Sequence, residues 1–179
     1  MDATEGKKTP IQRLKNTSSL INDMGKLPPQ AIDVEQVVLG AMMLEKDAVD
    51  NTIDILNEHS FYDPKHRIIF KTIHSLFAST SPIDLVTVSA QLQKTGELAA
   101  AGGAAYISSL TNRVASSSHI QYHARIISEK HIKRELIRVS SDIIKDSYDD
   151  TKDVFELLNT AETNLFKIAE TNMSKQAAT

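Results

Sequence analysis

Between residues 33 and 110 apolar positions recur every three or four residues, and a period of two is almost absent. This spacing is typical of amphipathic helices, because 3.6 residues per turn bring such positions onto one face. Proline and glycine interrupt the pattern at intervals. We therefore expect short helices with brief connections over residues 33–42, 47–57, 65–78, 84–92 and about 104–110, the fourth capped by Asp84.

After residue 118 two much longer helical stretches follow. The first is predicted from His119 to about Ser147, and the second from about Thr151 to Glu170, with a turn at residues 148–150. Two long helices joined by a short turn form an antiparallel hairpin. The predicted fold class is therefore all-α, a small helical globular subdomain followed by a long helical hairpin.

Two separate apolar lines run along the first long helix. One line has the spacing of a packed seam and contains Ile132, Leu136, Val139 and Ile143. The second long helix has a similar seam, which contains Val154, Leu158, Ala161, Leu165 and Ile168. The other line of the first helix lies more than a quarter turn away and contains Ile126, Ile137 and Ile144.

A single neighbouring helix can cover only one of these two lines. Burying an Ile or Leu side chain is worth about 1.5–3 kcal/mol, so leaving three isoleucines exposed would forgo several kcal/mol. We expect a second copy of the hairpin to cover the remaining line, which would make the protein a dimer. The alternative is that the globular part of the same chain folds over that line.

By composition the chain divides into four parts. Residues 1–27 combine scattered apolar positions with five basic side chains, and we expect a flexible basic tail or, alternatively, a short helix over residues 11–24 that lies on a partner. Pro28-Pro29 cannot continue a helix from upstream. Residues 28–115 are then the globular subdomain, residues 116–170 the hairpin as a dimerisation arm, and residues 171–179 the start of a linker to an absent motor domain.

The 179 residues contain no cysteine, carry a net charge of −3 and are 41% hydrophobic. Without cysteine there are no disulfides and no thiolate chemistry. The longest apolar run, residues 37–44, is too short to span a membrane, and we expect no secretion leader. These features predict a soluble, cytoplasmic protein that does not bind DNA tightly by itself, because it lacks a global positive field.

No motif for catalysis or nucleotide binding occurs in the sequence. A phosphate-binding loop needs Gly-x-x-x-x-Gly-Lys followed by Ser or Thr, and neither Gly6-Lys7 nor Gly25-Lys26 fits. His119 and His123 have the spacing of two metal ligands on one helix face, but the lack of an evident third ligand favours a solvated helix start. Basic and acidic residues alternate along the first long helix, as on a solvated surface rather than a nucleic-acid face. We expect no catalytic residue, cofactor or metal here.

Several short strings follow one another in a recognisable order. They are Pro28-Pro29 before Ala31, Val34-Glu35-Gln36, Val38-Leu39-Gly40, Phe61-Tyr62, His66, Ile69-Phe70, Pro82-Ile83-Asp84-Leu85-Val86-Thr87, Gly102-Gly103-Ala104-Ala105-Tyr106 and Phe166-Lys167-Ile168-Ala169-Glu170. Each string alone is weak, but their joint order and spacing resemble the start of the DnaB family of bacterial replicative DNA helicases. The resemblance covers about residues 28–170 and leaves residues 1–27 and 171–179 outside.

The resemblance implies the same helical globule with a hairpin, and a role in assembly. In this family such domains pair through their hairpins and form a collar of three dimers on a hexameric ring of motor domains, and the collar docks primase and, in some bacteria, helicase loaders. ATP and Mg²⁺ would bind to the later RecA-like domain, which this chain lacks, so unwinding of DNA would belong to the parent protein. For the subunit interface we carry over the region of the hairpin seam: Ile126, Ile132, Leu136, Ile137, Val139, Ile143 and Ile144, with Leu158 and Leu165 opposite.

Other functions stay open at this point. The helicase-binding domain of primase resembles the same helical architecture, but it would follow a long catalytic chain. A stand-alone helical DNA-binding protein would bind single-stranded DNA tightly and in a salt-sensitive manner. A small hydrolase would need an activity that no motif supports.

Overall fold

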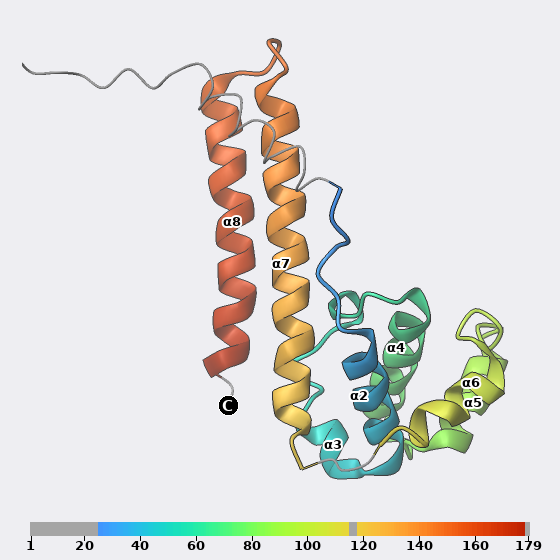
Figure 1. Cartoon of the computed structure of the whole chain (residues 1–179). Helices are drawn as coiled ribbons and strands as arrows, with labels where there is room; N and C mark the ends of the chain where they lie inside the picture. The colour runs from blue at the N-terminus through green and yellow to red at the C-terminus, as the bar shows by residue number, and fades with distance from the viewer. Residues whose placement is uncertain (1–24, 115–117, 178–179) are drawn as a thin grey trace, which may run out of the picture.

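The computed structural model describes residues 25–114 and 118–177, with side chains described as far as Glu170. All regular structure in these residues is helical, which confirms the predicted all-α class. The short elements are α2 (Ile32–Leu44), α3 (Lys46–Asp50), the 3-10 helix η1 (Glu58–Ser60), α4 (Pro64–Ala78), α5 (Leu85–Lys94) and α6 (Gly103–Thr111). Two long helices, α7 (Ile120–Ser147) and α8 (Val154–Ala177), stand beside this cluster (Figure 1). The tail or helix expected over residues 11–24 lies outside the described residues.

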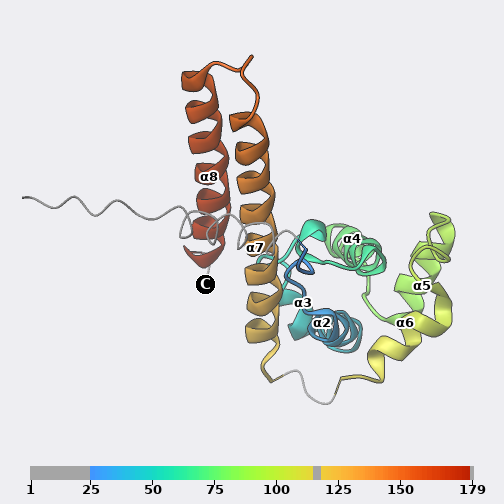
Figure 2. The same ribbon diagram turned by 45° about the horizontal axis from the view of Figure 1, so that its top comes forward.

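Helix α2 forms the centre of the globular part. Its residues Val38, Leu39, Ala41 and Met42 are fully buried, and the helix contacts all the neighbouring helices from α3 to α7. A helix that is apolar almost all round is stable only when neighbours cover every side. Figure 2 shows α2 nearly end-on, with α7 on one side and α5 and α6 on the other.

At Gly40 the backbones of α2 and α6 approach each other closely. A Cβ atom added to Gly40 would lie 2.8 Å from the carbonyl carbon of Leu110 and 2.9 Å from Cγ2 of Val114, well inside van der Waals contact. Glycine is the one residue that leaves this space empty. The close approach lets Ile107 and Leu110 of α6 join the core around α2.

A polar network lies inside this apolar core. Glu35 of α2 and His66 of α4 are fully buried, and His66 Nδ1 lies 2.6 Å from Glu35 Oε2. The same carboxylate accepts a 2.7 Å hydrogen bond from the backbone N–H of Tyr62, and His66 Nε2 lies 2.7 Å from the hydroxyl of Tyr106 on α6. Buried polar groups are tolerated when each has a partner. The network therefore ties α2, α4 and α6 together.

The predicted cap at Asp84 is confirmed. Its side chain accepts hydrogen bonds of 2.8 Å from the backbone N–H groups of Val86 and Thr87, and the Thr87 hydroxyl accepts one from the Asp84 N–H in return. The bond from the Thr87 backbone holds the pKa of Asp84 below its ordinary value, because it favours the charged carboxylate. Asp63 caps α4 with a single bond, a 2.9 Å hydrogen bond that its side chain accepts from the Lys65 N–H.

The helix predicted over residues 47–57 is wrong in extent. Helix α3 ends at Asp50, and turns follow it up to η1. Asn57 starts η1 with a capping box, in which its side chain accepts from the Ser60 N–H while Ser60 Oγ accepts from the Asn57 N–H. Asn, Ser and Thr make such local bonds readily, and these bonds compete with a continuous helix. The apolar residues of the segment are nevertheless buried as predicted: Val49, Ile53 and Leu56.

Helices α7 and α8 run antiparallel and form the predicted hairpin. Asp153 caps α8 by accepting hydrogen bonds from two backbone N–H groups of the first turn. Helix α8 passes the end expected at Glu170 and continues to Ala177, through most of the residues expected to start a linker. No proline or glycine in residues 171–177 would stop it.

The first turns of α7 belong to the core of the globular part. Ile120, Ala124 and Ile127 are buried among residues of the short helices. One continuous helix thus serves both the globular part and the hairpin, so the division expected at residue 116 is not a boundary in the packing. Within the described residues, no helix combines the length and the apolar character that a membrane span requires.

Candidate interaction surface on the hairpin

Helix α7 has three faces that differ in their surroundings. Each residue turns the helix by about 100°, which assigns its side chain to one of them. The first face contacts the globular part through Ile127 and its neighbours in the core. Two turns further along the same face, Arg134 donates hydrogen bonds to the backbone carbonyls of Pro29 (2.9 Å) and Ser60 (2.6 Å). Its guanidinium also lies over the ring of Tyr62, 5.7 Å from the centroid. Burial is the main cause that lowers the pKa of Arg134, although the group stays cationic at any neutral pH.

The second face of α7 packs against α8. Val139 is fully buried, and Ile132 and Ile143 are half-buried on the same line. The half-buried positions of α8 have the matching spacing: Leu157, Ala161, Asn164 and Ile168. The seam predicted on α7 is therefore confirmed at three positions, whereas its fourth member, Leu136, is exposed.

The seam predicted on α8 is wrong at three of its five positions, of which Val154 is 60% exposed. The prediction places Leu158 and Leu165 against α7, but these side chains are 58% and 44% exposed. Of the predicted seam, Ala161 and Ile168 are half-buried. Steps of four and three recur on neighbouring lines of one helix, so spacing alone does not choose between the lines.

The third face combines exposed apolar residues of both helices. Ile144 follows Ile143 of the α7 seam and Leu158 follows Leu157 of the α8 seam, so each lies about 100° further round its own helix. Because α7 and α8 are antiparallel, this rotation turns both side chains to the same side of the hairpin. Ile137 and Ile144 are 53% and 45% exposed. We call four of the exposed residues on this side the hairpin face: Ile137, Ile144, Leu158 and Leu165.

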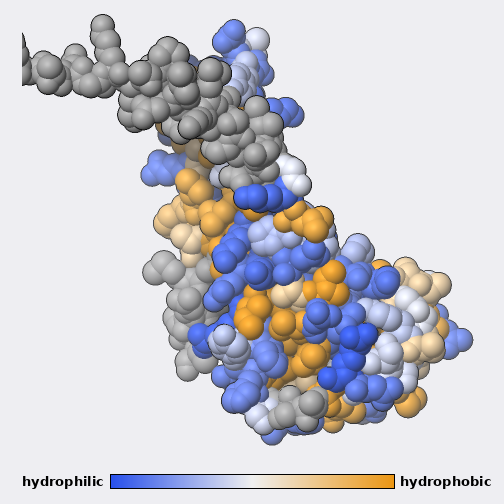
Figure 3. All heavy atoms as spheres, in the orientation of Figure 1, coloured by the Kyte–Doolittle hydropathy of each residue, from blue (hydrophilic) through white to orange (hydrophobic). Residues whose placement is uncertain are grey.

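Covering the hairpin face would be favourable. Full burial of an Ile or Leu side chain is worth about 1.5–3 kcal/mol, so burying the exposed half of four of them contributes about 3–6 kcal/mol. Figure 3 shows apolar side chains on the side of the hairpin turned to the reader. Ile126, predicted on the same line as Ile137, is half-buried because it lies nearer the globular part. Contiguous exposed apolar residues mark protein–protein contacts.

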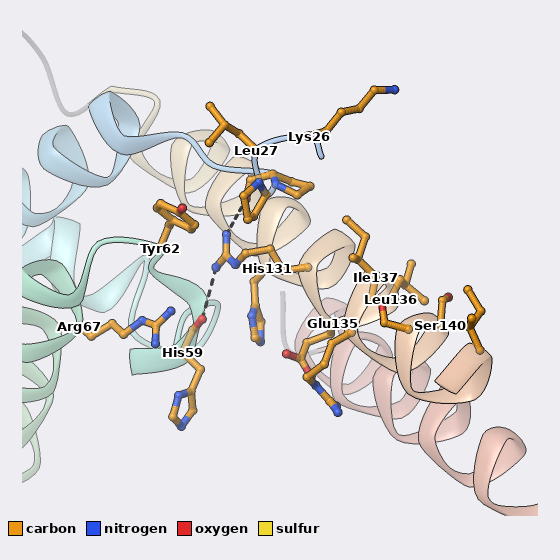
Figure 4. A pocket seen from close by; sticks show the side chains of 16 residues that line it. Lys26, Leu27, His59, Tyr62, Arg67, His131, Glu135, Leu136, Ile137 and Ser140 are labelled. Atoms are coloured by element: carbon orange, nitrogen blue, oxygen red, sulfur yellow. Dashed lines mark hydrogen bonds and ion pairs between the residues drawn. The ribbon is translucent and has the colours of Figure 1, made fainter. Parts of the chain in front are cut away.

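A groove of about 990 Å³ lies beside α7, between this helix, residues 26–29 and the region of η1. Figure 4 shows Tyr62 and Arg67 toward one end and Leu136, Ile137 and Ser140 along α7 toward the other. The dashed lines mark the hydrogen bonds that Arg134 of α7 donates to the backbone carbonyls of Pro29 and His59, at the end of the groove near Tyr62.

The two histidines considered as metal ligands lie at the start of α7. His119 is exposed and His123 is half-buried, and no group of three potential ligands comes together within residues 25–114 and 118–170. Interpreting all basic residues of α7 as solvated is wrong for Arg134, whose spacing from Ile120 and Ile127 places it on the buried face. His66 is three residues before the buried Ile69 and so lies on the same face of α4. This spacing could have predicted that His66 is buried.

Comparisons with known proteins agree with this geometry. Residues 27–129 match the family described as DnaB-like helicase N terminal domain. A replicative DNA helicase DnaB of Rhodothermus marinus is 41% identical over 174 residues, which are 97% of this chain and 18% of that protein. The replicative DNA helicase DnaC of Bacillus subtilis is 37% identical over 153 residues, 86% of this chain and 33% of that protein. The chain thus spans a third or less of the length of these two relatives.

Solved structures give the same result. The N-terminal domain of DnaB helicase from Mycobacterium tuberculosis has a TM-score of 0.74 and 32% identity, and the match covers 79% of this chain and 99% of that one. A DnaB-like replicative helicase studied with its interactions with primase has a TM-score of 0.65 and 25% identity, over 77% of this chain and 31% of that one. The 174-residue match also includes most of residues 1–27, which corrects the expectation that the likeness begins at residue 28. The chain therefore belongs to the DnaB-like helicase N terminal domain family.

Proposed function

We propose that this domain assembles a replicative helicase by pairing through the hairpin face, and that it docks primase. In a hexameric parent protein, such pairing would give three dimers. No phosphate-binding loop occurs in the sequence, so the proposed role is non-catalytic. Unwinding of duplex DNA with ATP and Mg²⁺ would belong to other parts of a longer parent protein.

The exposed hairpin face is the observation that supports self-association. The globular part packs on the face of α7 that contains Ile127, so it leaves Ile137 and Ile144 exposed. This argues against the alternative in which the globular part covers them. A second copy offers the same four residues, and a symmetric pair would bury both sets at once.

Primase docking is supported by family likeness. One similar solved structure is described as a DnaB-like replicative helicase and its interactions with primase. We extend to this domain the role of docking primase. That it also docks a helicase loader is proposed on the family likeness alone. The family match gives no support to the alternative that the chain is the helicase-binding domain of a primase.

Light scattering coupled to size exclusion tests the proposed pairing. We expect the wild-type chain to elute with a mass above the 19.8 kDa of one copy, and Ile137→Glu and Leu158→Glu each to shift it toward that mass with helicity retained. A charge on the hairpin face would have to be buried without a partner, which is costly. The matched control is Val86→Glu, an exposed apolar position on α5. A wild type that stays monomeric at high concentration while fully folded would contradict the proposal.

Direct DNA binding is the competing function. The net charge of −3 and the mixed charges of α7 argue against it. A fluorescence-anisotropy titration with a single-stranded oligonucleotide at low and moderate salt decides between the two. Weak binding is expected, and tight salt-sensitive binding would favour the DNA-binding alternative.

A further inference from the structure

We infer that the groove beside α7 is a docking site for an acidic amphipathic helix of a partner protein. The inference rests on the docking part of the proposed function. Because Ile137 and Ile144 belong to both the groove and the hairpin face, a partner helix in the groove would compete with a second copy for these two side chains. It commits to the chemistry of the occupant, a helix with carboxylates at its amino-terminal end and apolar side chains along one face.

Two arginines give one end of the groove a positive charge. Arg67 and Arg134 both line this end, and their hydrogen bonds go to neutral carbonyl oxygens. Arg67 Nε donates to Phe61 O at 2.8 Å, and Arg134 donates to Pro29 and Ser60. The two guanidinium groups are close enough that Arg67 lowers the pKa of Arg134. Neutral partners leave these two charges able to attract a carboxylate from outside.

The carboxylates nearby are already occupied. Glu135, the one anionic side chain among the described lining residues, lies 3.0 Å from Arg138, which also lies 3.0 Å from Asp142. The hydrogen bond from Arg138 lowers the pKa of Glu135, as expected for a satisfied ion pair. The buried Glu35 offsets part of the charge of Arg134, but His66 and a backbone N–H fill its oxygens.

The charge of the groove is therefore opposite in sign to that of the whole chain. Four cationic side chains and one carboxylate are found among its described lining residues, whereas the chain carries −3 overall. Complementary charge of this kind selects partners and orients them. The positive charge of the groove favours binding of an acidic segment and disfavours binding of a basic segment.

The rest of the groove is an apolar strip on α7. Ile137 and Ile144 are half-exposed at positions two turns apart, a rise of about 10 Å. Ser141 lies between them, and its hydroxyl already donates to the carbonyl of Ile137 at 2.8 Å, so covering it leaves no unsatisfied donor. Leu27, 80% exposed, adds a side chain from the chain segment on the other wall. A partner helix with apolar residues at every third or fourth position matches this length.

A single-stranded nucleic acid is the occupant that the groove fits less well. Successive bases stack on successive aromatic side chains in such sites. Tyr62 is the one phenol, phenyl or indole ring among the described lining residues, and the guanidinium of Arg134 lies over it. An acidic helix needs no such platform, and carboxylates at its amino-terminal end also suit the positive end of its own dipole.

The inference is tested with the full chain and three labelled probes by fluorescence anisotropy, at chain concentrations at which light scattering finds single copies, so that a second copy does not cover Ile137 and Ile144. The first probe is a synthetic peptide of about 14 residues, or four helical turns, with glutamates at the amino end and leucines at every third or fourth position. The second has lysines in place of the glutamates, and the third is a single-stranded thymidine oligonucleotide. We expect saturable binding of the acidic peptide, which weakens as salt rises.

The variants separate charge from apolar contact. Arg67→Gln and Leu27→Ser should each weaken binding about three- to tenfold, whereas Arg67→Lys should retain most of it. Matched controls are Arg113→Gln and Leu44→Ser, exposed positions that do not line the groove, and both should bind as the wild type does. Light scattering of the same variants should be unchanged, because neither Arg67 nor Leu27 belongs to the hairpin face.

The results separate this inference from the proposed pairing. Absence of acidic-peptide binding, equal binding of the lysine peptide, or indifference to Arg67→Gln and Leu27→Ser would each overturn it, even if the chain still self-associates. Preferred binding of the oligonucleotide that these two substitutions weaken would overturn it in favour of a nucleic-acid site. A monomeric wild type that binds the acidic peptide would support this inference while contradicting self-association.

Discussion

Replacing Glu35 with Leu should destabilise the domain severely, because this carboxylate is the acceptor at the centre of the buried network. The substitution removes the partner of the Tyr62 backbone N–H, at 2.7 Å, and of His66 Nδ1, at 2.6 Å. Leaving one buried donor unsatisfied costs about 1–3 kcal/mol, and two give about 2–6 kcal/mol.

This loss is large compared with the whole stability of a small domain, which is about 5–15 kcal/mol. Glu35→Gln should lose less, about 1–2 kcal/mol, since the amide oxygen can still accept from the Tyr62 N–H and the amide nitrogen can donate to His66 Nδ1. That arrangement needs the other tautomer of His66, whose Nε2–H would then donate to the Tyr106 hydroxyl.

Urea denaturation followed by circular dichroism measures these differences. All variants are compared at one protein concentration, because self-association would add to the apparent stability. Asp54→Asn is the matched control, since Asp54 is exposed in the same globular part, and its free energy of unfolding should change by less than about 0.5 kcal/mol.

A double-mutant cycle gives the sharper test. Adding His66→Phe to Glu35→Leu removes both members of the pair, so the double variant should lose less than the sum of the single losses, by at least about 1 kcal/mol. Equal stability of Glu35→Leu and Glu35→Gln, or strict additivity in the cycle, would refute the view that this contact holds α2 and α4 together.

Substitutions at three further positions test other contacts by the same denaturation assay. Gly40→Ala should cost about 1–3 kcal/mol, because the added methyl group meets the backbone of Leu110; unchanged stability would contradict the close approach. Asp84→Asn should keep most of the cap at neutral pH. The pKa of Asp84 is lowered in the folded state, so the wild type gains stability above the ordinary value of 3.8 and loses it as pH falls through the folded value. The asparagine variant should lack this loss of stability below about pH 4. If the free energy of unfolding fell equally in the variant and the wild type below about pH 4, the prediction would be contradicted. Arg134→Met should lower the free energy of unfolding by about 2–3 kcal/mol, and Arg134→Lys by nearly as much. A single ammonium group cannot reach both the Pro29 and Ser60 carbonyls as the forked guanidinium does. Wild-type stability of the lysine variant would contradict this prediction.

Features that depend on neighbours in sequence were predictable. The cap at Asp84 needs only the next three residues, and the burial of Val49, Ile53 and Leu56 follows from their spacing even where the helix itself breaks. The α7 seam at Val139 follows from periodicity for the same reason. Such patterns record which side of an element is covered, without naming what covers it.

Features that depend on distant partners were not predictable from one sequence. The Glu35–His66 contact joins residues 31 positions apart, and the bond from Arg134 to Pro29 joins residues 105 positions apart. No local pattern encodes either pairing. Two of the four residues on the inner line of α8, Leu157 and Asn164, were missed, because Leu157 and Leu158 are adjacent and both belong to lines with helical spacing. Only the packed pair of helices distinguishes the two.

Because α7 is anchored in the core by Ile120 to Ile127 and then continues without proline or glycine, it can act as a rigid lever. The 20 residues from Ile127 to the end of the helix at Ser147 extend about 30 Å. A tilt of about 10° at the anchored end would carry the tip of the hairpin about 5 Å, close to the pitch of one helical turn. Small repacking around α2 would thus be magnified into a much larger displacement at the tip of the hairpin.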